Sequence, residues 1–359
     1  MRKAAGSTIP ITLLTGFLGS GKTTLLNRLI RQPNMARTLV VINEFGEIGL
    51  DHQLFSATDE TEVVALDSGC LCCTIRGDLA RTLRDAPWRY SRGGQRQFDR
   101  LVIETTGLAD PAPILHTLMT DPKIVRRYRL DGVVTTIDAV HGSITLDRHQ
   151  EAVKQAAVAD RLLITKSDLA ATPALDSLQA RLEKINPGAR RQMVTNGEIG
   201  AESLIGLGLP NVDGTRPSIE RWLGAYPKPP VMSGLAFNAG AASNRSPLIF
   251  DEKSQGDPNR HDDHIRAHCF KLDEPIVLER FEAWLELILA LMGENMLRIK
   301  GILNLEGHDK PTVIHGVQHI FHPPMDLAAW PDDDRRSRLV FITRNIPRES
   351  LESLMAAVV

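Results

Sequence analysis

A glycine-rich segment near the start of the 359-residue chain constrains its fold more than any other part of the sequence. Gly16, four further residues and then Gly21-Lys22-Thr23 have the spacing of a Walker A phosphate-binding loop. Residues 9–15 form an apolar run typical of a buried strand, and residues 24–30 have apolar side chains at helical spacing. A loop between a strand and a helix lets backbone N–H groups converge on phosphate oxygens at the positive end of the helix dipole. The segment therefore predicts a nucleotide triphosphate site.

The loop also suggests roles for its side chains. Lys22 would reach the β- and γ-phosphates, and the Thr23 hydroxyl would bind Mg²⁺. We expect the nucleotide to be bound by the loop residues Gly16, Gly19, Ser20, Gly21, Lys22, Thr23 and Thr24.

Short β-branched segments alternate with helical patterns through the first two-thirds of the chain. We expect strands at 38–42, 101–103, 132–137 and 161–164, and helices at 79–83, 150–159 and 175–185. Strands without polar alternation, separated by helices, favour a mostly parallel sheet that is covered on both faces. The ligand of such a sheet binds beyond the carboxyl ends of its strands.

The last part of the chain predicts a second domain. A segment rich in Pro, Gly, Ser and Asn begins near Pro217 and is typical of a linker. Ordered patterns resume near residue 265, with a helix from 278, strands at 297–305, 312–320 and 338–343, and a closing helix after Pro347. We therefore expect an α/β P-loop NTPase domain at 1–216 with a mostly parallel sheet, a flexible linker at 217–264, and a smaller α+β domain at 265–359.

Composition narrows the classes of partner. The formal net charge is −2 and the pI is about 6.6, which gives no electrostatic case for nucleic acid or a membrane surface. The longest apolar runs are strand-length, and the first eight residues lack the apolar core of a secretory signal. Four cysteines, three of them clustered, make a poor disulfide framework. These features predict a cytoplasmic setting.

A second motif concerns the nucleotide base. Thr165-Lys166-Ser167-Asp168 follows a predicted strand and resembles the Asn-Lys-x-Asp element that recognises guanine, with Thr in place of Asn. The Asp168 carboxylate can accept hydrogen bonds from the N1–H and 2-amino groups of guanine, and Lys166 can lie over the purine face. The alternative is a polar turn in which Asp168 caps a helix. We expect Thr165, Lys166 and Asp168 to bind GTP.

Two segments are candidates for the hydrolysis machinery. The strand at 101–103 ends in Glu104 and leads to Gly107, where nucleotide hydrolases place an acid near Mg²⁺ and a glycine N–H near the γ-phosphate. Residues 43–51 form the other candidate loop, and its Asp51, Glu44 or Glu47 could complete the Mg²⁺ site, unless these acids lie in a solvated polar loop. We assign catalytic roles to Lys22, Glu104 and Gly107. The sequence shows no obvious arginine finger or water-orienting Gln, so we expect slow intrinsic hydrolysis.

Three cysteines lie in Gly69-Cys70-Leu71-Cys72-Cys73, between the two candidate loops. As thiolates around one ion they suit Zn²⁺ and similar metals. The fourth ligand is left open among water, Glu44, Glu47, His116 and Cys269. A redox-active pair and buried cysteines without a role are the alternatives.

Together these motifs resemble the CobW family of P-loop GTPases, relatives of the GTPases that deliver nickel to urease and hydrogenase. The resemblance rests on 16–24, 43–51, 69–73, 104–107 and 165–168, and extends to 297–301 and 338–342 in the second domain. It implies a GTPase metallochaperone that uses GTP and Mg²⁺ and carries Zn²⁺ or Co²⁺ at Cys70, Cys72 and Cys73.

The resemblance also implies a client metalloprotein as partner, and it leaves open a nucleotide-dependent homodimer. Two other functions stay open. One is a redox-gated GTPase, in which a disulfide among the cysteines blocks the two loops. The other is an assembly factor for a metalloenzyme, similar to an activator of nitrile hydratase, that carries no metal.

Overall fold

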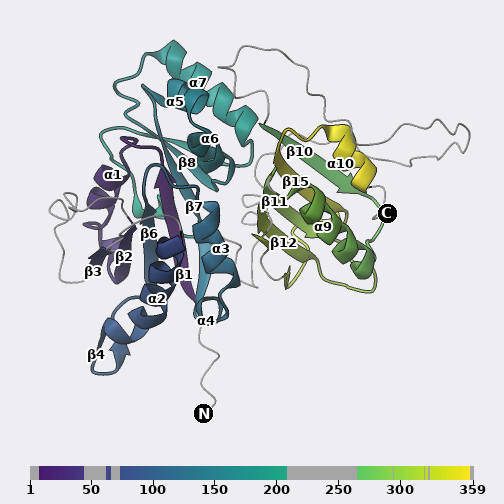
Figure 1. The fold of residues 1–359 in the computed structure, drawn as a ribbon, viewed down its shortest axis with the longest axis horizontal. Coiled ribbons are helices and arrows are strands. Elements are labelled where there is room, and N and C mark those ends of the chain that lie inside the picture. The colour runs from purple at the N-terminus through teal and green to yellow at the C-terminus, as the bar shows by residue number, and fades with distance from the viewer. Residues whose placement is uncertain are drawn as a thin grey trace, which may run out of the picture.

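Two β-sheets, one from each end of the chain, organise the structure (Figure 1). The computed structural model describes residues 8–43, 62–65, 73–207, 265–293, 295–318, 320–321 and 324–355. The predicted boundaries of the linker, after residues 216 and 264, adjoin or lie within 208–264, outside the described residues. The domain limits therefore stay a prediction.

The first sheet has seven strands in the order β3-β2-β6-β1-β7-β8-β9, and every neighbouring pair is parallel. Its strands are β1 (Ile9–Gly16), β2 (Thr38–Asn43), β3 (Glu62–Ala65), β6 (Arg100–Thr105), β7 (Tyr128–Asp138), β8 (Arg161–Thr165) and β9 (Arg190–Val194). A short hairpin of β4 (Ser91–Arg92) and β5 (Gln95–Arg96) lies apart from it. The predicted parallel sheet is confirmed.

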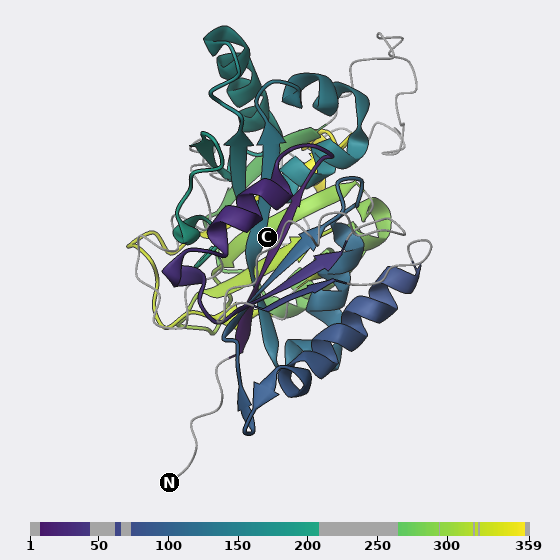
Figure 2. The same cartoon turned by 90° about the vertical axis from the view of Figure 1, so that its left-hand side faces the viewer.

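Helices cover both faces of this sheet, because successive strand side chains point to opposite sides. Leu14 packs against α1 on one face, and the neighbouring Leu13 packs in the cluster that holds α2 and α3 on the other. Figure 2 shows these layers side-on. The helices are α1 (Lys22–Leu29), α2 (Cys73–Arg89), α3 (Ala112–Thr120), α4 (Pro122–Val125), α5 (Gly142–Arg148), α6 (Gln150–Ala157) and α7 (Thr172–Ile185), with 3₁₀ turns η1 (Pro33–Met35) and η3 (Ala201–Ser203).

The second sheet is antiparallel, in the order β10-β15-β11-β12-β13, with β14 paired to β12. Two helices contribute to the apolar cluster on one face of it. Its elements are β10 (Ile265–Leu272), α9 (Leu278–Met292), β11 (Met296–Leu303), β12 (Thr312–Val317), β13 (Ile320–Phe321), β14 (Met325–Asp326), β15 (Ser337–Arg344) and α10 (Arg348–Met355). The predicted strand at 312–320 is wrong in extent, because the chain turns at Gln318, whose φ is 53°, and β13 folds back on β12.

The other face of the second sheet packs on the first domain. β10 contacts α7, β11 contacts α6, and β13 contacts α3. A register shift between Met296 and Arg298 lets Leu297 join the apolar cluster of α6 and α7, whereas Ile299 packs under α9. The alternation of apolar side chains that predicted the strand at 297–305 is therefore interrupted at its start, where Leu297 and Ile299 lie on opposite faces.

A buried group of charges lies at this contact. Asp160 lies directly before β8. One of its carboxylate oxygens accepts hydrogen bonds from Arg298 and from Lys300 Nζ, the latter at 2.8 Å, and the other accepts one from the Val133 N–H of β7. Arg298 also donates to the Val158 carbonyl oxygen. The His315 Nε2 atom lies 3.4 Å from a nitrogen of the Arg298 guanidinium. Burial alone would raise the pKa of Asp160, but the charges on Arg298 and Lys300 outweigh it and hold that pKa well below its usual range.

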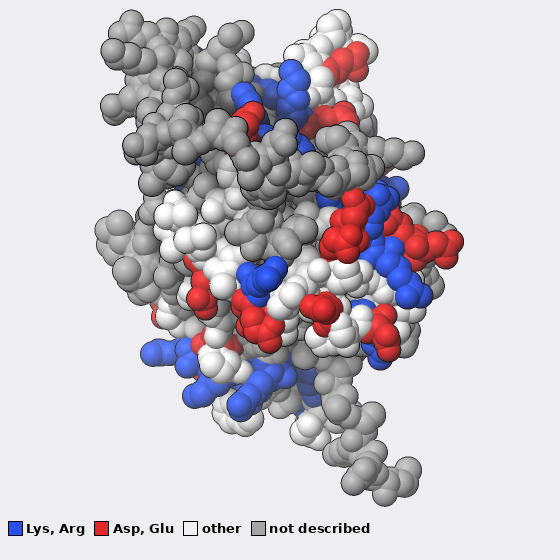
Figure 3. Space-filling model, turned by 90° about the vertical axis from the view of Figure 1, so that its right-hand side faces the viewer, with Lys and Arg blue, Asp and Glu red and all other residues white. Residues whose placement is uncertain are grey.

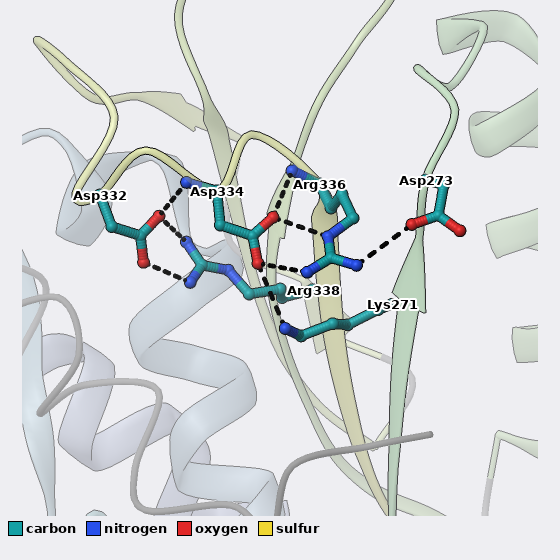
Figure 4. Close-up of polar contacts among 6 residues, drawn as sticks. All are labelled: Lys271, Asp273, Asp332, Asp334, Arg336 and Arg338. Atoms are coloured by element: carbon teal, nitrogen blue, oxygen red, sulfur yellow. Dashed lines mark hydrogen bonds and ion pairs between the residues drawn. The ribbon is translucent and has the colours of Figure 1, made fainter. Parts of the chain in front are cut away.

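A second, more exposed network fixes the turn before β15 (Figure 4). Asp334 accepts from Arg336 at 2.7 Å and from Lys271 of β10 at 3.2 Å, and Asp332 accepts from Arg338 at 2.7 Å. The hydrogen bonds from Arg336 lower the pKa of Asp334. Basic side chains therefore pair with the carboxylates of Asp332 and Asp334, which accounts for these two acids as structural residues.

The surface of the second domain mixes the two signs of charge. Figure 3 shows acidic and basic side chains close together on this side of the molecule, with further Lys and Arg side chains gathered in the lower part of the view. This mixture agrees with the formal net charge of −2. Within the described ranges, no helix is long and apolar enough to cross a membrane.

The buried charges yield a prediction about stability. Asp160→Asn leaves Arg298 and Lys300 buried without a compensating charge, so we expect it to lower the free energy of unfolding by about 3–5 kcal/mol. Guanidinium titration measures the change. The control is Asp99→Asn, which breaks an exposed pair with Arg37 and should cost less than about 1 kcal/mol. Equal losses in the two variants would contradict the prediction.

The stability of the parent chain and that of Asp160→Asn should also depend differently on pH. The pKa of Asp160 is lower in the folded than in the unfolded chain, where it is near 3.8, so its contribution is complete above that pH. The difference in stability between the parent chain and Asp160→Asn should narrow as the pH falls below about 4. The comparison is made in acid, because burial lowers the pKa of Lys300 to about 8 and its own titration changes the difference near that pH. A difference that widens in acid would refute the assignment.

Candidate functional site

The glycine loop joins β1 to α1 as predicted. Gly16 ends β1 with a φ of 141°, and a Cβ there would lie 2.2 Å from Thr136 Oγ1 of β7. Gly21 precedes α1 with a φ of 89°, in the left-handed region that favours glycine. The sequence folds in this way because only glycine fits both the close approach and the backbone angle. The N-terminus of α1 consequently faces the loop.

Lys22 is the first residue of α1 and is almost fully buried. Its Nζ donates to the carbonyl oxygens of Gly16 at 2.9 Å and Phe17 at 3.1 Å, so the ammonium lies inside the curve of the loop. Ser20 Oγ donates to the Phe17 carbonyl at 2.7 Å and lies 2.6 Å from Thr136 Oγ1. These contacts shape a loop that can surround phosphate oxygens with N–H groups and one cation.

Thr23 and Glu104 meet across 81 residues of sequence. The Thr23 hydroxyl donates to Glu104 Oε1 at 2.9 Å, and Glu104 is 3% exposed near the end of β6. A hydroxyl and a carboxylate beside a phosphate loop form the donor set that Mg²⁺ prefers. The two residues therefore fit the expected magnesium ion.

Gly107 follows β6 and packs against the glycine loop. A Cβ on Gly107 would lie 2.6 Å from the backbone nitrogen of Leu18, so no side chain fits there. The segment at 106–110 consequently lies against the phosphate loop, where a glycine N–H could respond to a γ-phosphate.

The structure also connects the predicted base motif to the glycine loop. Thr165 Oγ1 donates to the Ser20 carbonyl at 2.7 Å, and Lys166 Nζ donates to the Gly19 carbonyl at 2.8 Å. Asp168 is exposed and accepts from the Asn196 N–H at 3.4 Å. Threonine thus supplies the link to the phosphate loop at this position, and Asp168 keeps its carboxylate accessible to a base.

Sequence reasoning missed one buried acid of the site. Asp138 ends β7 and forms an ion pair with Lys166 at 2.7 Å. Burial alone would raise the pKa of Asp138, but hydrogen bonds from Lys166 and from the His141 and Val140 N–H groups outweigh it and lower the pKa. Its position at the carboxyl end of a predicted strand was the signal that could have identified it. A cavity of about 260 Å³ between the glycine loop and α5 is lined by Phe17, Asp138 and Lys166, among others.

Several predicted ligands lie outside the described residues: Glu44, Glu47, Asp51, Cys70 and Cys72. The backbone on either side of the cysteines is described. Ala65 ends β3 and Cys73 begins α2. Ala65 and Glu104 both pair with Ile42, from opposite sides of β2, so their Cα atoms are about 10 Å apart. The chain therefore leaves the sheet toward the cysteines at the level of Glu104.

The structure describes the surroundings of two candidates for the fourth metal ligand, His116 and Cys269. His116 lies in α3, where its Nδ1 is 3.3 Å from Thr120 Oγ1. Cys269 lies in β10, and burial raises the pKa of its thiol to about 11, which disfavours the thiolate that a metal requires. Among the residues that the structure describes, no three His, Cys, Asp or Glu side chains gather as a metal site.

Comparison with known proteins identifies the families that the two domains match. Residues 10–192 match the family described as CobW/HypB/UreG, nucleotide-binding domain, and residues 265–359 match the cobalamin synthesis protein cobW C-terminal domain. The zinc chaperone YjiA of Escherichia coli is 32% identical over 97% of this chain and 98% of its own length. The zinc-regulated GTPase metalloprotein activator 1 of Schizosaccharomyces pombe is 30% identical over 95% of this chain and 84% of its own.

A solved structure agrees over the whole chain. The crystal structure of Zn(II)-bound YjiA GTPase from E. coli has a TM-score of 0.67 and 28% identity, and the match covers 99% of this chain and 100% of that one. The glycine loop, the Thr23–Glu104 pair, Gly107 and the Thr165–Asp168 motif thus lie on a matching two-domain fold. From both domain matches and the relatives, the chain belongs to the CobW family and is a GTPase.

Proposed function

We propose that this chain is a GTP-dependent zinc metallochaperone that binds Zn²⁺ through Cys70, Cys72 and Cys73 and delivers it to a client metalloprotein. The relatives support the choice of metal, because two of them are named a zinc chaperone and a zinc-regulated metalloprotein activator. Cobalt, the other ion that the family resemblance implied, is a competitor in the experiments below.

One observation carries the proposal. The Thr23–Glu104 pair lies at the level of the sheet from which the chain departs toward the cysteines, because Glu104 and Ala65 flank the same residue of β2. A change at the nucleotide would therefore act close to the end of β3, from which the chain continues to the cysteines. α2 begins at Cys73, and the partial positive charge of a helix N-terminus favours thiolates near it.

The magnesium ion would be held by Thr23 and Glu104, with Asp51, Glu44 or Glu47 as further candidates. When bound, it supplies positive charge that neutralises the developing charge on the β- and γ-phosphates. The remaining work falls to the chain. Lys22 binds the phosphates, and the Gly107 N–H responds to the γ-phosphate.

Coupling to zinc follows from linkage. If GTP orders 43–51 and the Gly107 segment, and these shape the thiolate site, then zinc binds more tightly in the GTP state. Zinc must then strengthen GTP binding by the same factor. Hydrolysis removes the γ-phosphate, loosens both segments and releases the ion to the client.

The base assignment is tested with Asp168→Asn. An amide cannot accept from both N1–H and the 2-amino group, so we expect GTP affinity to fall about 10- to 100-fold. The amide can donate to the 2-oxo group of xanthine, so binding of xanthosine triphosphate should rise. Fluorescence titration with both nucleotides measures this. Unchanged GTP affinity would assign Asp168 to the helix-capping alternative.

Zinc coupling is tested by competitive titration of Zn²⁺ in Mg²⁺·GTP against Mg²⁺·GDP. We expect at least about a 5-fold higher zinc affinity with GTP, in the usual range of coupling between sites. Replacing Cys70, Cys72 or Cys73 by Ser should remove both tight binding and the dependence on nucleotide, whereas Cys269→Ser should change neither. Equal affinities in both nucleotide states would refute the coupling, and Co²⁺ in parallel tests the metal.

The redox alternative is tested by counting thiols. Aerobically purified, metal-free protein should show three rapidly alkylated thiols at pH 8, because Cys269 is buried and its high pKa keeps it protonated. Zn²⁺ should protect these three. A single reactive thiol, with two more released by a reductant, would instead favour a redox-gated GTPase.

A further inference from the structure

Helix α6 (Gln150–Ala157) touches the Gly107 segment through two side chains that the proposed function does not use. Gln155 Nε2 donates to the Gly107 carbonyl at 3.3 Å and to the Ala109 carbonyl at 3.0 Å. Lys154 Nζ forms an ion pair with Asp110 at 2.7 Å. Two successive residues of one short helix thus hold both ends of the same loop.

The surroundings of Gln155 indicate that its amide serves this loop. The side chain is 1% exposed, and its Nε2 faces two carbonyl oxygens, which fixes the orientation of the amide. Its Oε1 is buried and has no hydrogen-bond partner among the residues that the structure describes. An apolar residue would avoid the cost of an unsatisfied buried acceptor, so the glutamine is explained by what its amide group donates to.

Gly107 lies between this clamp and the phosphate loop. Its Cα faces the Leu18 backbone so closely that a Cβ would come within 2.6 Å of the Leu18 nitrogen, while its carbonyl accepts from Gln155. A displacement of Gly107 would therefore change the position of its N–H relative to a γ-phosphate. Small displacements of positioned groups have large effects on rate.

The helix itself is anchored at both ends. At its start, the His149 ring stacks on Phe17 of the phosphate loop with ring centroids 4.4 Å apart, and Gln150 accepts from Arg344 of β15 at 3.1 Å. After its end, the Val158 carbonyl accepts from Arg298 of β11. The clamp on Gly107 is consequently fixed to the phosphate loop and to the second domain at once.

We propose that Gln155 and Lys154 are positioning residues for GTP hydrolysis: they hold 107–110 against the phosphate loop, on a helix that the second domain fixes. The proposal rests on the GTPase activity of the family and does not require zinc. It supplies a physical connection through which a client on the second domain could alter hydrolysis.

The first test replaces the buried donor. In Gln155→Leu we expect kcat for GTP hydrolysis to fall roughly 10- to 100-fold with the KM for GTP unchanged. Single-turnover kinetics should show the same fall in the rate constant of the hydrolysis step. Amide hydrogen exchange at 107–110 should accelerate. The matched control is Gln32→Leu, because Gln32 also bridges a loop, donating to Ile199 O at 2.6 Å and accepting from the Ala201 N–H at 2.9 Å. The control should lose stability but keep kcat.

The second test uses the ion pair of Lys154 and Asp110, whose side chains are 24% and 30% exposed, so its variants should fold even if Gln155→Leu does not. Lys154→Asp and Asp110→Lys should each lower kcat, and the double variant with exchanged charges should recover most of it. A stabilising role alone would leave kcat unaffected in all folded variants. Parent-like kcat in Gln155→Leu, or in both single charge reversals, would overturn the proposal.

Discussion

The buried carboxylate of Asp160 is the interaction on which the arrangement of the two domains depends. A charge removed from water must find its partners, and those of Asp160 come from β7 on one side and from Arg298 and Lys300 of β11 on the other. Because all of these groups are buried, a different docking of the second domain would leave unpaired charges inside the protein. The free-energy cost of such unpaired charges selects one orientation of the second domain relative to the first. Much of the contact around Asp160 is apolar and would not select an orientation by itself.

This fixed orientation has consequences at the nucleotide end. Asp160 lies directly before β8 and bonds to Val133 in the middle of β7. The two strands end in Asp138 and Thr165, and Asp138 pairs with Lys166 immediately after β8. Of the two helices between these strands, α6 contacts both β11 and the Gly107 segment. The second domain is thus connected to the base motif through two strands and to the hydrolysis segment through one helix. Neither route needs a long flexible element.

How much of this the sequence could predict depends on how local the signal was. The glycine loop, the parallel sheet and the meeting of Thr23 with Glu104 follow from spacing and from the rule that parallel strands end at one edge. Arg298 and Lys300 could not be placed, because alternation predicts a solvated face for them and only the docked domain buries it. The role of Gln155 could not be predicted for the same reason. A single glutamine in an amphipathic helix forms no recognisable motif, and only the folded structure shows that it contacts the Gly107 segment. Residues 44–61 and 66–72 lie outside the described structure, so the cysteine site is inferred from the sequence and from the strand and helix that flank it, β3 and α2.

The position of the cysteines relative to the sheet has a physical logic of its own. A thiolate cluster without metal is electrostatically unfavourable, so its geometry is sensitive to any change in nearby charge. Ile42 of β2 lies between Ala65 and Glu104, which brings the end of β3, the last described residue before the cysteines, within two strand spacings of Glu104. Two ions and a triphosphate would then share one edge of one sheet. At such separations charges interact strongly unless water screens them, so nucleotide hydrolysis and zinc affinity would be difficult to keep independent. On this view, coupling follows from the topology of the sheet, and the helices around it tune its strength.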